Sequence, residues 1–205
     1  IEIVILFFVV SIVYASVGFG GGSSYLAILA LYSLPFKEMR MIALICNIIV
    51  VTGGTYHYIR NKQVNWFKVL PLILLSIPMS YIGASIRISE RTFFILLGIS
   101  LIVASFLLWI KTKPLENGNA FEAKKQDPLK NALAGAGIGF FSGMVGIGGG
   151  IFLSPFLHLR KWDDSKRIAA TASLFILVNS LSGIAGQFSD LSSVDGTRIL
   201  LLSVA

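Results

Sequence analysis

The chain has 205 residues, of which 55% are hydrophobic and only 13% are charged. With a mean hydropathy of +0.82, it has little polar surface to offer water, and a polytopic membrane protein is the class that fits. The formal charge of +7 does not indicate a nucleic-acid-binding protein, because the basic residues lie in short loops beside apolar runs, where topology and lipid headgroups explain them.

The first two apolar runs, 3–17 and 23–34, flank a glycine stretch, Gly18–Gly22, which we call the first break. At about 1.5 Å per residue neither run comfortably crosses a hydrocarbon core of about 30 Å. We therefore expect a broken helix or a re-entrant hairpin whose two halves meet at mid-depth. Three runs of about full spanning length follow it, at 41–59, 67–87 and 92–110.

A polar segment, 111–130, then interrupts the apolar pattern with two prolines and five lysines. Its composition is typical of a solvated linker. We interpret it as the boundary between a first transmembrane repeat, 1–110, and a second, 131–205. The second half resumes with apolar runs at 131–145, 151–159 and 169–188 and an unfinished one from 197.

The second half repeats the first. Its glycine stretch Gly146–Gly150, the second break, matches the first break at an offset of 128, and Arg167–Ala170 matches Arg40–Ala43 at an offset of 127. Each half therefore consists of a hairpin, a basic loop and long helices. By this analogy the last run ends at about position 213 and one more span follows it. We therefore expect the C-terminal end to be incomplete.

The basic residues predict an orientation. If each hairpin returns the chain to the side it came from, twelve of the 17 Lys and Arg residues lie on one side and five on the other. The positive-inside rule makes the richer side, which holds the linker 111–130, cytoplasmic and places the N-terminus in the periplasm. Three full spans then separate the hairpins, so the second half enters from the opposite side and the halves form inverted-topology repeats, an arrangement found in secondary transporters.

Both breaks are predicted to bind an anion. A half-helix that begins inside the membrane presents unpaired N–H groups and about +0.5 of a charge, and glycine lets a ligand approach the backbone. Buried polar side chains at neighbouring helical levels would add donors. The predicted substrate-binding residues are Gly20, Gly21, Gly22, Ser23, Ser24, Asn47, Thr52, Gly148, Gly149, Gly150, Ser173 and Asn179. The alternative is that the glycines only allow close helix packing and the hydroxyls bond to their own helices.

Arg40 and Arg167 occupy equivalent positions at the start of long helices. In one interpretation each lies at one mouth of the pathway and attracts anions. In the other, both extend to lipid headgroups and set the topology.

Catalysis and metal binding find little support in the sequence. No Asp or Glu lies within an apolar run, the two histidines are not at ligand spacing, and the single cysteine, Cys46, excludes disulfides within the chain and a cysteine-based metal cluster. We therefore expect no enzyme, no cofactor and no metal.

Together these motifs make the chain resemble the TauE/SafE family of membrane transporters, also called the sulfite exporter family. The second half carries the likeness in Gly143–Gly150 with Leu153-Ser154-Pro155 and in Lys166–Ser173, and the first half in Gly18–Gly22. The resemblance covers nearly the whole chain. It implies transport of sulfite, sulfonates such as sulfoacetate, and related organosulfur anions across the bacterial inner membrane, typically as export.

We therefore expect an all-α secondary transporter of a small sulfur oxyanion that works by alternating access in the bacterial inner membrane. An anion channel or passive facilitator, a carrier of another small anion such as a carboxylate, and a subunit that only scaffolds partners are the alternatives. The expected partners are the anion and membrane lipids, without nucleic acid. Both a monomer and a homodimer fit the sequence.

Overall fold

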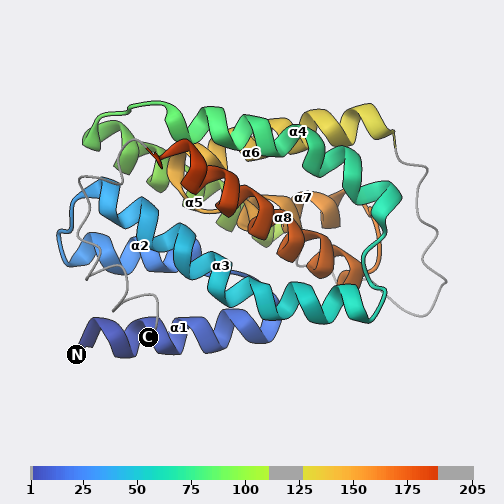
Figure 1. Cartoon of the computed structure of the whole chain (residues 1–205), viewed down its shortest axis with the longest axis horizontal. Helices are drawn as coiled ribbons and strands as arrows, with labels where there is room; N and C mark the ends of the chain where they lie inside the picture. The colour runs from blue at the N-terminus through green and yellow to red at the C-terminus, as the bar shows by residue number, and fades with distance from the viewer. Residues whose placement is uncertain (1, 111–126, 189–205) are drawn as a thin grey trace.

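The computed structural model describes residues 2–110 and 127–188, which form eight α-helices and, within these ranges, no β-strand (Figure 1). The all-helical class predicted from the sequence is confirmed. In chain order the helices are α1 (Glu2–Val17), α2 (Gly22–Leu31), α3 (Phe36–Arg60), α4 (Trp66–Ser85), α5 (Glu90–Ile110), α6 (Pro128–Val145), α7 (Gly150–Leu159) and α8 (Ser165–Gly186).

The long helices have the length and composition of membrane spans. Four of them, α3, α4, α5 and α8, are long and apolar enough to cross a bilayer, whereas α1, α2 and α7 are shorter apolar helices. Large apolar side chains face outward, including Phe67 at 94% exposure and Ile102 at 71%. Such surface is stable only against lipid or another apolar partner, so this is a multi-pass membrane protein.

The two predicted breaks interrupt the helices at equivalent positions. Helix α1 ends at Val17 and α6 at Val145, and both returning helices, α2 and α7, have 10 residues. All these bounds correspond at the offset of 128. In Figure 1 the chain enters the first hairpin from the end of the bundle marked N and the second from the opposite end. These chain directions are those that inverted repeats require; the repeat relation and its orientation in a membrane stay predictions.

Glycines bring α4 and α6 into direct backbone contact. Gly135, Gly139 and Gly143 follow one another at four-residue spacing on one face of α6, and a Cβ at any of them would collide with the backbone of α4, at Leu72, Ser76 and Ser80 respectively. Small residues at this spacing let two helices approach without intervening side chains, which is how membrane helices associate without a hydrophobic driving force. The two helices lie side by side and run in the same direction (Figure 1).

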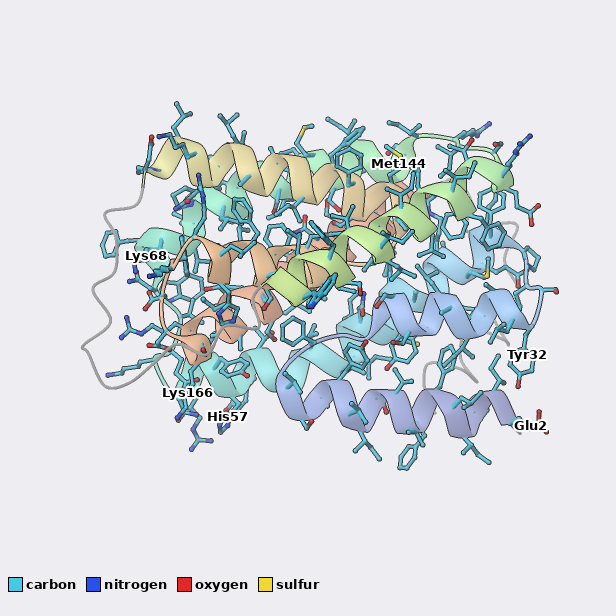
Figure 2. The ribbon with its side chains drawn as sticks, turned by 180° about the vertical axis from the view of Figure 1, so that it is seen from behind. Glu2, Tyr32, His57, Lys68, Met144 and Lys166 are labelled. Carbon is cyan, nitrogen blue, oxygen red and sulfur yellow. The ribbon has the colours of Figure 1, made fainter. Side chains whose placement is uncertain are left out.

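Charged groups lie at the ends of the bundle. Figure 2 shows His57, Lys68 and Lys166 at one end and Glu2 and Tyr32 at the other. We call the former the basic end. The loop between α3 and α4 and the loop between α7 and α8 meet there, where Lys68 pairs with Asp163 at 2.7 Å.

Parts of two predicted segments lie outside the described residues. Of the predicted linker 111–130, the structure describes only 127–130, and there the helix α6 already begins at Pro128, capped by the Asp127 side chain. The apolar run expected from 197 is not among the described residues. The division into 1–110, 111–130 and 131–205 therefore stays a prediction.

Candidate functional site

The backbone of each break turns through the left-handed region. Gly18 and Gly146 both have φ of 80°, and Gly21 and Gly149, which immediately precede α2 and α7, have φ of 77° and 86°. An L-residue with a side chain is strained in this region, so glycine is required here. Neither α2 nor α7 has a side-chain cap at its N-terminus. The N–H groups of Ser24 and Phe152 already donate to the carbonyl oxygens of Gly21 and Gly149, which leaves the first two N–H groups of each helix to a ligand.

The two breaks touch each other. A Cβ at Gly22 would lie 2.9 Å from the carbonyl oxygen of Ile147, in the second break. Asn47, on α3, lies between them: its Nδ2 donates to the Ile147 carbonyl oxygen at 2.9 Å, and its Oδ1 faces Gly20. The two breaks therefore lie side by side in the structure, although anion binding there stays a prediction.

A cavity of about 240 Å³ opens between the breaks. Since water occupies about 30 Å³ per molecule in the liquid, this space can hold a small anion with a few waters. None of the residues that line it is charged. They are Tyr14, Phe19, Gly20, Gly21, Gly22, Ser23, Asn47, Ile147, Gly150, Ile151, Ser154, Pro155 and Ile176.

Asn47 carries an unsatisfied acceptor. The residue is fully buried, and among the described residues its Oδ1 has no hydrogen-bond partner. The amide orientation is fixed, because the atom that faces the Ile147 carbonyl must be the donor nitrogen. An unpaired buried acceptor costs about 1–3 kcal/mol, and a water, or a ligand that carries a donor hydrogen, would offset this cost when it occupies the cavity.

The predicted binding residues divide into two groups. Gly20, Gly21, Gly22, Ser23, Asn47 and Gly150 line the cavity. The others lie beside it or elsewhere: Ser24 bonds to the hydroxyl of Tyr14 at 2.9 Å, Gly148 packs against Ser180 and Asn47, and Gly149 packs against Phe175 and Ser142. Gly148 and Gly149 thus shape the second break without lining the cavity.

Three predicted side chains lie away from the cavity. Thr52 is exposed on α3 and bonds to the carbonyl oxygen of Ile48 in its own helix. Ser173 joins α8 to α3 through Thr55, at 2.8 Å between the hydroxyl oxygens. Asn179 is buried against α4, where it donates to the Ser76 hydroxyl at 3.1 Å. Their placement assigns Ser173 and Asn179 to helix packing and Thr52 to the surface.

Arg40 lies in the interior of the bundle. It is 3% exposed, and its Nη2 donates to the carbonyl oxygens of Ala84, at 3.2 Å, and Gly143, at 3.1 Å. Both carbonyls belong to the last turns of their helices, α4 and α6, where the dipole favours a cation. Arg40 therefore joins two helix ends beside the second break, and its role at a pathway mouth stays a prediction.

Arg167, by contrast, is exposed at the basic end. Its side chain is 45% exposed and lies 3.5 Å from the carboxylate of Asp164 and 3.9 Å from that of Asp163. Arg40 and Arg167 match in the predicted repeat, but Arg40 is buried and Arg167 is exposed. An exposed, partly neutralised arginine is compatible with either a mouth or a topology signal.

Sequence reasoning missed several cavity residues. Ser154 is the clearest case: it follows Gly150 by four residues and so faces the same side of α7, a relation that the sequence contains. Tyr14 lies before the first break and is recognisable only once the hairpin folds back. The remaining missed residues are Phe19, Ile147, Ile151, Pro155 and Ile176, most of them apolar.

Within the described ranges no cluster of three His, Cys, Asp or Glu residues could hold a metal ion. The site is an uncharged cavity between two helix N-termini, within the fold of a multi-pass membrane protein.

Comparison with known proteins identifies the family. The model of the family described as sulfite exporter TauE/SafE matches residues 3–205, and the chain belongs to this family. It is 34% identical over 187 residues to the probable membrane transporter protein y4hK of Sinorhizobium fredii, covering 91% of this chain and 75% of that protein.

Two further relatives carry similar names. A probable membrane transporter protein of Haemophilus influenzae is 29% identical over 200 residues, covering 89% of this chain and 70% of that protein. The probable membrane transporter protein YunE of Bacillus subtilis is 29% identical over 154 residues, covering 66% and 56%. No solved structure matches the chain. The chain is thus a membrane transporter, as the sequence predicts.

Proposed function

We propose that this transporter is a secondary carrier that moves a small organosulfur or sulfur oxyanion, such as sulfite or a sulfonate, out of the bacterial cell by alternating access. One observation carries the proposal: the uncapped N-termini of α2 and α7 belong to different halves of the chain and open onto one cavity. Two helix N-termini directed at one space favour an anion. The family description, sulfite exporter, supports the choice of sulfur oxyanion.

In this proposal the anion accepts hydrogen bonds from the N–H groups of Gly22 and Ser23 and of Gly150 and Ile151, with hydroxyls of Ser23, Ser154 and Tyr14 as further donors. Apolar neighbours such as Phe19 and Ile176 exclude water, which strengthens these interactions. The absence of any charged residue among those that line the cavity favours a weakly held ligand, and a carrier must release its ligand.

Direct contact between the breaks supports a carrier over a channel. The Asn47 amide and the Ile147 carbonyl pack directly against Gly22 beside the cavity, so that a continuous pore would require the breaks to separate. In our proposal they separate only during the conformational cycle. The proposed orientation places the N-terminus in the periplasm and the basic end in the cytoplasm, as the positive-inside rule predicts.

The test is flux into proteoliposomes that contain the purified protein. We expect saturable uptake of labelled sulfite or sulfoacetate, and acceleration of that uptake when the vesicles are preloaded with unlabelled anion, because a carrier exchanges ligands across its cycle. Uptake without saturation or exchange would indicate a channel. If the protein binds a carboxylate but neither sulfite nor sulfoacetate, the proposed substrate class, a sulfur oxyanion, is wrong.

A further inference from the structure

An apolar groove on the outside of the bundle lies apart from the anion cavity. It has a volume of about 440 Å³ and runs between α5 and α6, with α7 as its floor. Its walls include Leu96 and Val103 of α5 and Leu133 and Phe141 of α6, and its floor includes Phe156. Leu133 and Phe141 are 60% and 54% exposed, so the groove is open along its length to whatever surrounds the protein.

The groove has the length of one leaflet. On α6 its lining extends from Leu133 to Val145, which is about 18 Å at 1.5 Å per residue. Half of a hydrocarbon core is about 15 Å. Because α6 begins and α7 ends at the basic end of the bundle (Figure 1), the groove runs from that end to about mid-depth.

Cations lie at the outer end of the groove. The guanidinium of Arg160, which follows the last residue of α7, lies 5.0 Å from the ring centre of Phe156. Lys130 lies about one turn before Leu133 on α6; its side chain is 66% exposed, and its Nζ lies 3.7 Å from the carboxylate of Asp127. Lys130 is in the first turn of α6 and Arg160 directly follows α7, and these two helix ends lie at the basic end (Figure 1). An apolar groove that ends in two cations matches an acyl chain that ends in a phosphate.

We propose that this groove binds an anionic glycerophospholipid, with one acyl chain between α5 and α6 and the phosphate beside Arg160 and Lys130. A second copy of the chain is a less suitable occupant. In a dimer with its twofold axis along the membrane normal, Arg160 and Lys130 of one copy would lie near those of the other, and the like charges would repel. The bound chain would lie against Phe152 and Phe156 of α7, the half-helix that begins at the cavity. The inference does not depend on the identity of the transported anion.

Two glycines provide a matched pair of variants. Gly137 lines the groove and Gly98, on α5, does not, and a Cβ at either would have no heavy atom within 4 Å. Gly137→Leu would therefore fill the groove without a clash, whereas Gly98→Leu adds the same side chain elsewhere on the outer surface. Both replace a helical glycine, so their effects on helix propensity are alike.

The experiment is native mass spectrometry of the full chain, purified from nanodiscs that contain equal amounts of phosphatidylglycerol and phosphatidylcholine. We expect the wild type and Gly98→Leu to retain one phosphatidylglycerol, and Gly137→Leu to retain at least about tenfold less, a difference of about 1.4 kcal/mol. In Arg160→Gln the preference for phosphatidylglycerol over phosphatidylcholine should fall severalfold towards one.

Retention by Gly137→Leu equal to that of the wild type would overturn the proposal. So would loss of a dimer in Gly137→Leu at unchanged lipid retention, since that result would assign the groove to a second copy. Independently of any variant, a phosphatidylglycerol with a photoreactive acyl chain should label peptides of α5, α6 and α7 in the wild type. Equal labelling of α1, which also has an outward apolar face, would contradict a specific site.

Discussion

The side-chain nitrogen of Asn47 donates a hydrogen bond to the carbonyl oxygen of Ile147 over 2.9 Å, and so joins a helix of the first half to the break of the second. The same side chain faces Gly20 and Gly22 of the first break. A single buried amide thus connects both breaks, and its chemistry is the most direct test of the site.

Asn47→Asp should weaken anion binding strongly. The carboxylate would be isosteric but would repel both the Ile147 carbonyl and any anion in the cavity, and two like charges about 5 Å apart at an effective dielectric constant of about 20 repel by about 3 kcal/mol. We expect affinity for the transported anion to fall at least about tenfold, measured by isothermal titration. Asn179→Asp is the control, because Asn179 is equally buried but lies away from the cavity. Equal loss in both variants would indicate that Asn47 acts only in packing.

Gly22→Ala should force the two breaks apart. The new Cβ would lie 2.6 Å from Asn47 Nδ2 and 2.9 Å from the Ile147 carbonyl oxygen, closer than real Cβ atoms come to their neighbours, so we expect a lower midpoint of thermal unfolding in detergent and loss of transport. Gly53→Ala on α3 has no heavy atom within 4 Å of its Cβ and should be neutral or more stable by up to about 1 kcal/mol, the difference in helix propensity. Full activity in Gly22→Ala would contradict the close contact between the breaks.

Arg40→Gln should reduce stability and leave anion affinity unchanged. It removes the charge-assisted hydrogen bonds to the carbonyls of Ala84 and Gly143, and we expect a loss of about 3 kcal/mol in the free energy of unfolding. Arg167→Gln, at an exposed site, should cost less than about 1 kcal/mol. Unchanged stability of Arg40→Gln, together with transport that is reduced at low salt, would instead support a role at a pathway mouth.

The proposed orientation can be tested with single cysteines at positions 61 and 90 in a Cys46→Ser background. Cys46 is buried and is the only cysteine of the chain, so its removal leaves no competing thiol. A membrane-impermeant maleimide added to intact cells should label position 90 and should reach position 61 only after lysis. Labelling of position 61 in intact cells would reverse the topology.

Helix positions could be predicted closely where apolar runs end in glycine. The apolar runs that predict α3 and α8 begin only at 41 and 169, whereas the helices begin at Phe36 and Ser165. Hydropathy misses these first turns because they are polar. What begins α8 is a cap, in which the Asp164 side chain accepts from the Arg167 N–H, and capping residues lie outside the apolar pattern.

The cavity could be predicted only in part. The glycines were found because a left-handed turn requires them, and Asn47 because a buried amide is costly. Thr52 matches Asn179 at the repeat offset of 127, yet five residues rotate it by about 140° around α3 from Asn47, which turns it outward. Runs that are apolar on all sides do not reveal which face is buried, so Thr52, Ser173 and Asn179 could not be assigned to a face.

The glycine stripe of α6 has a mechanical consequence. Helix α4 belongs to the first half and α6 to the second, yet their backbones meet at Gly135, Gly139 and Gly143 without a side chain between them. Ser80 and Ser182 add hydrogen bonds between α4 and α8, at 3.0 and 2.6 Å. We expect helices held by such contacts to move together. The parts that shift against each other during transport would then not coincide with the two predicted repeats, so that the internal repeat and the moving units would divide the chain along different lines.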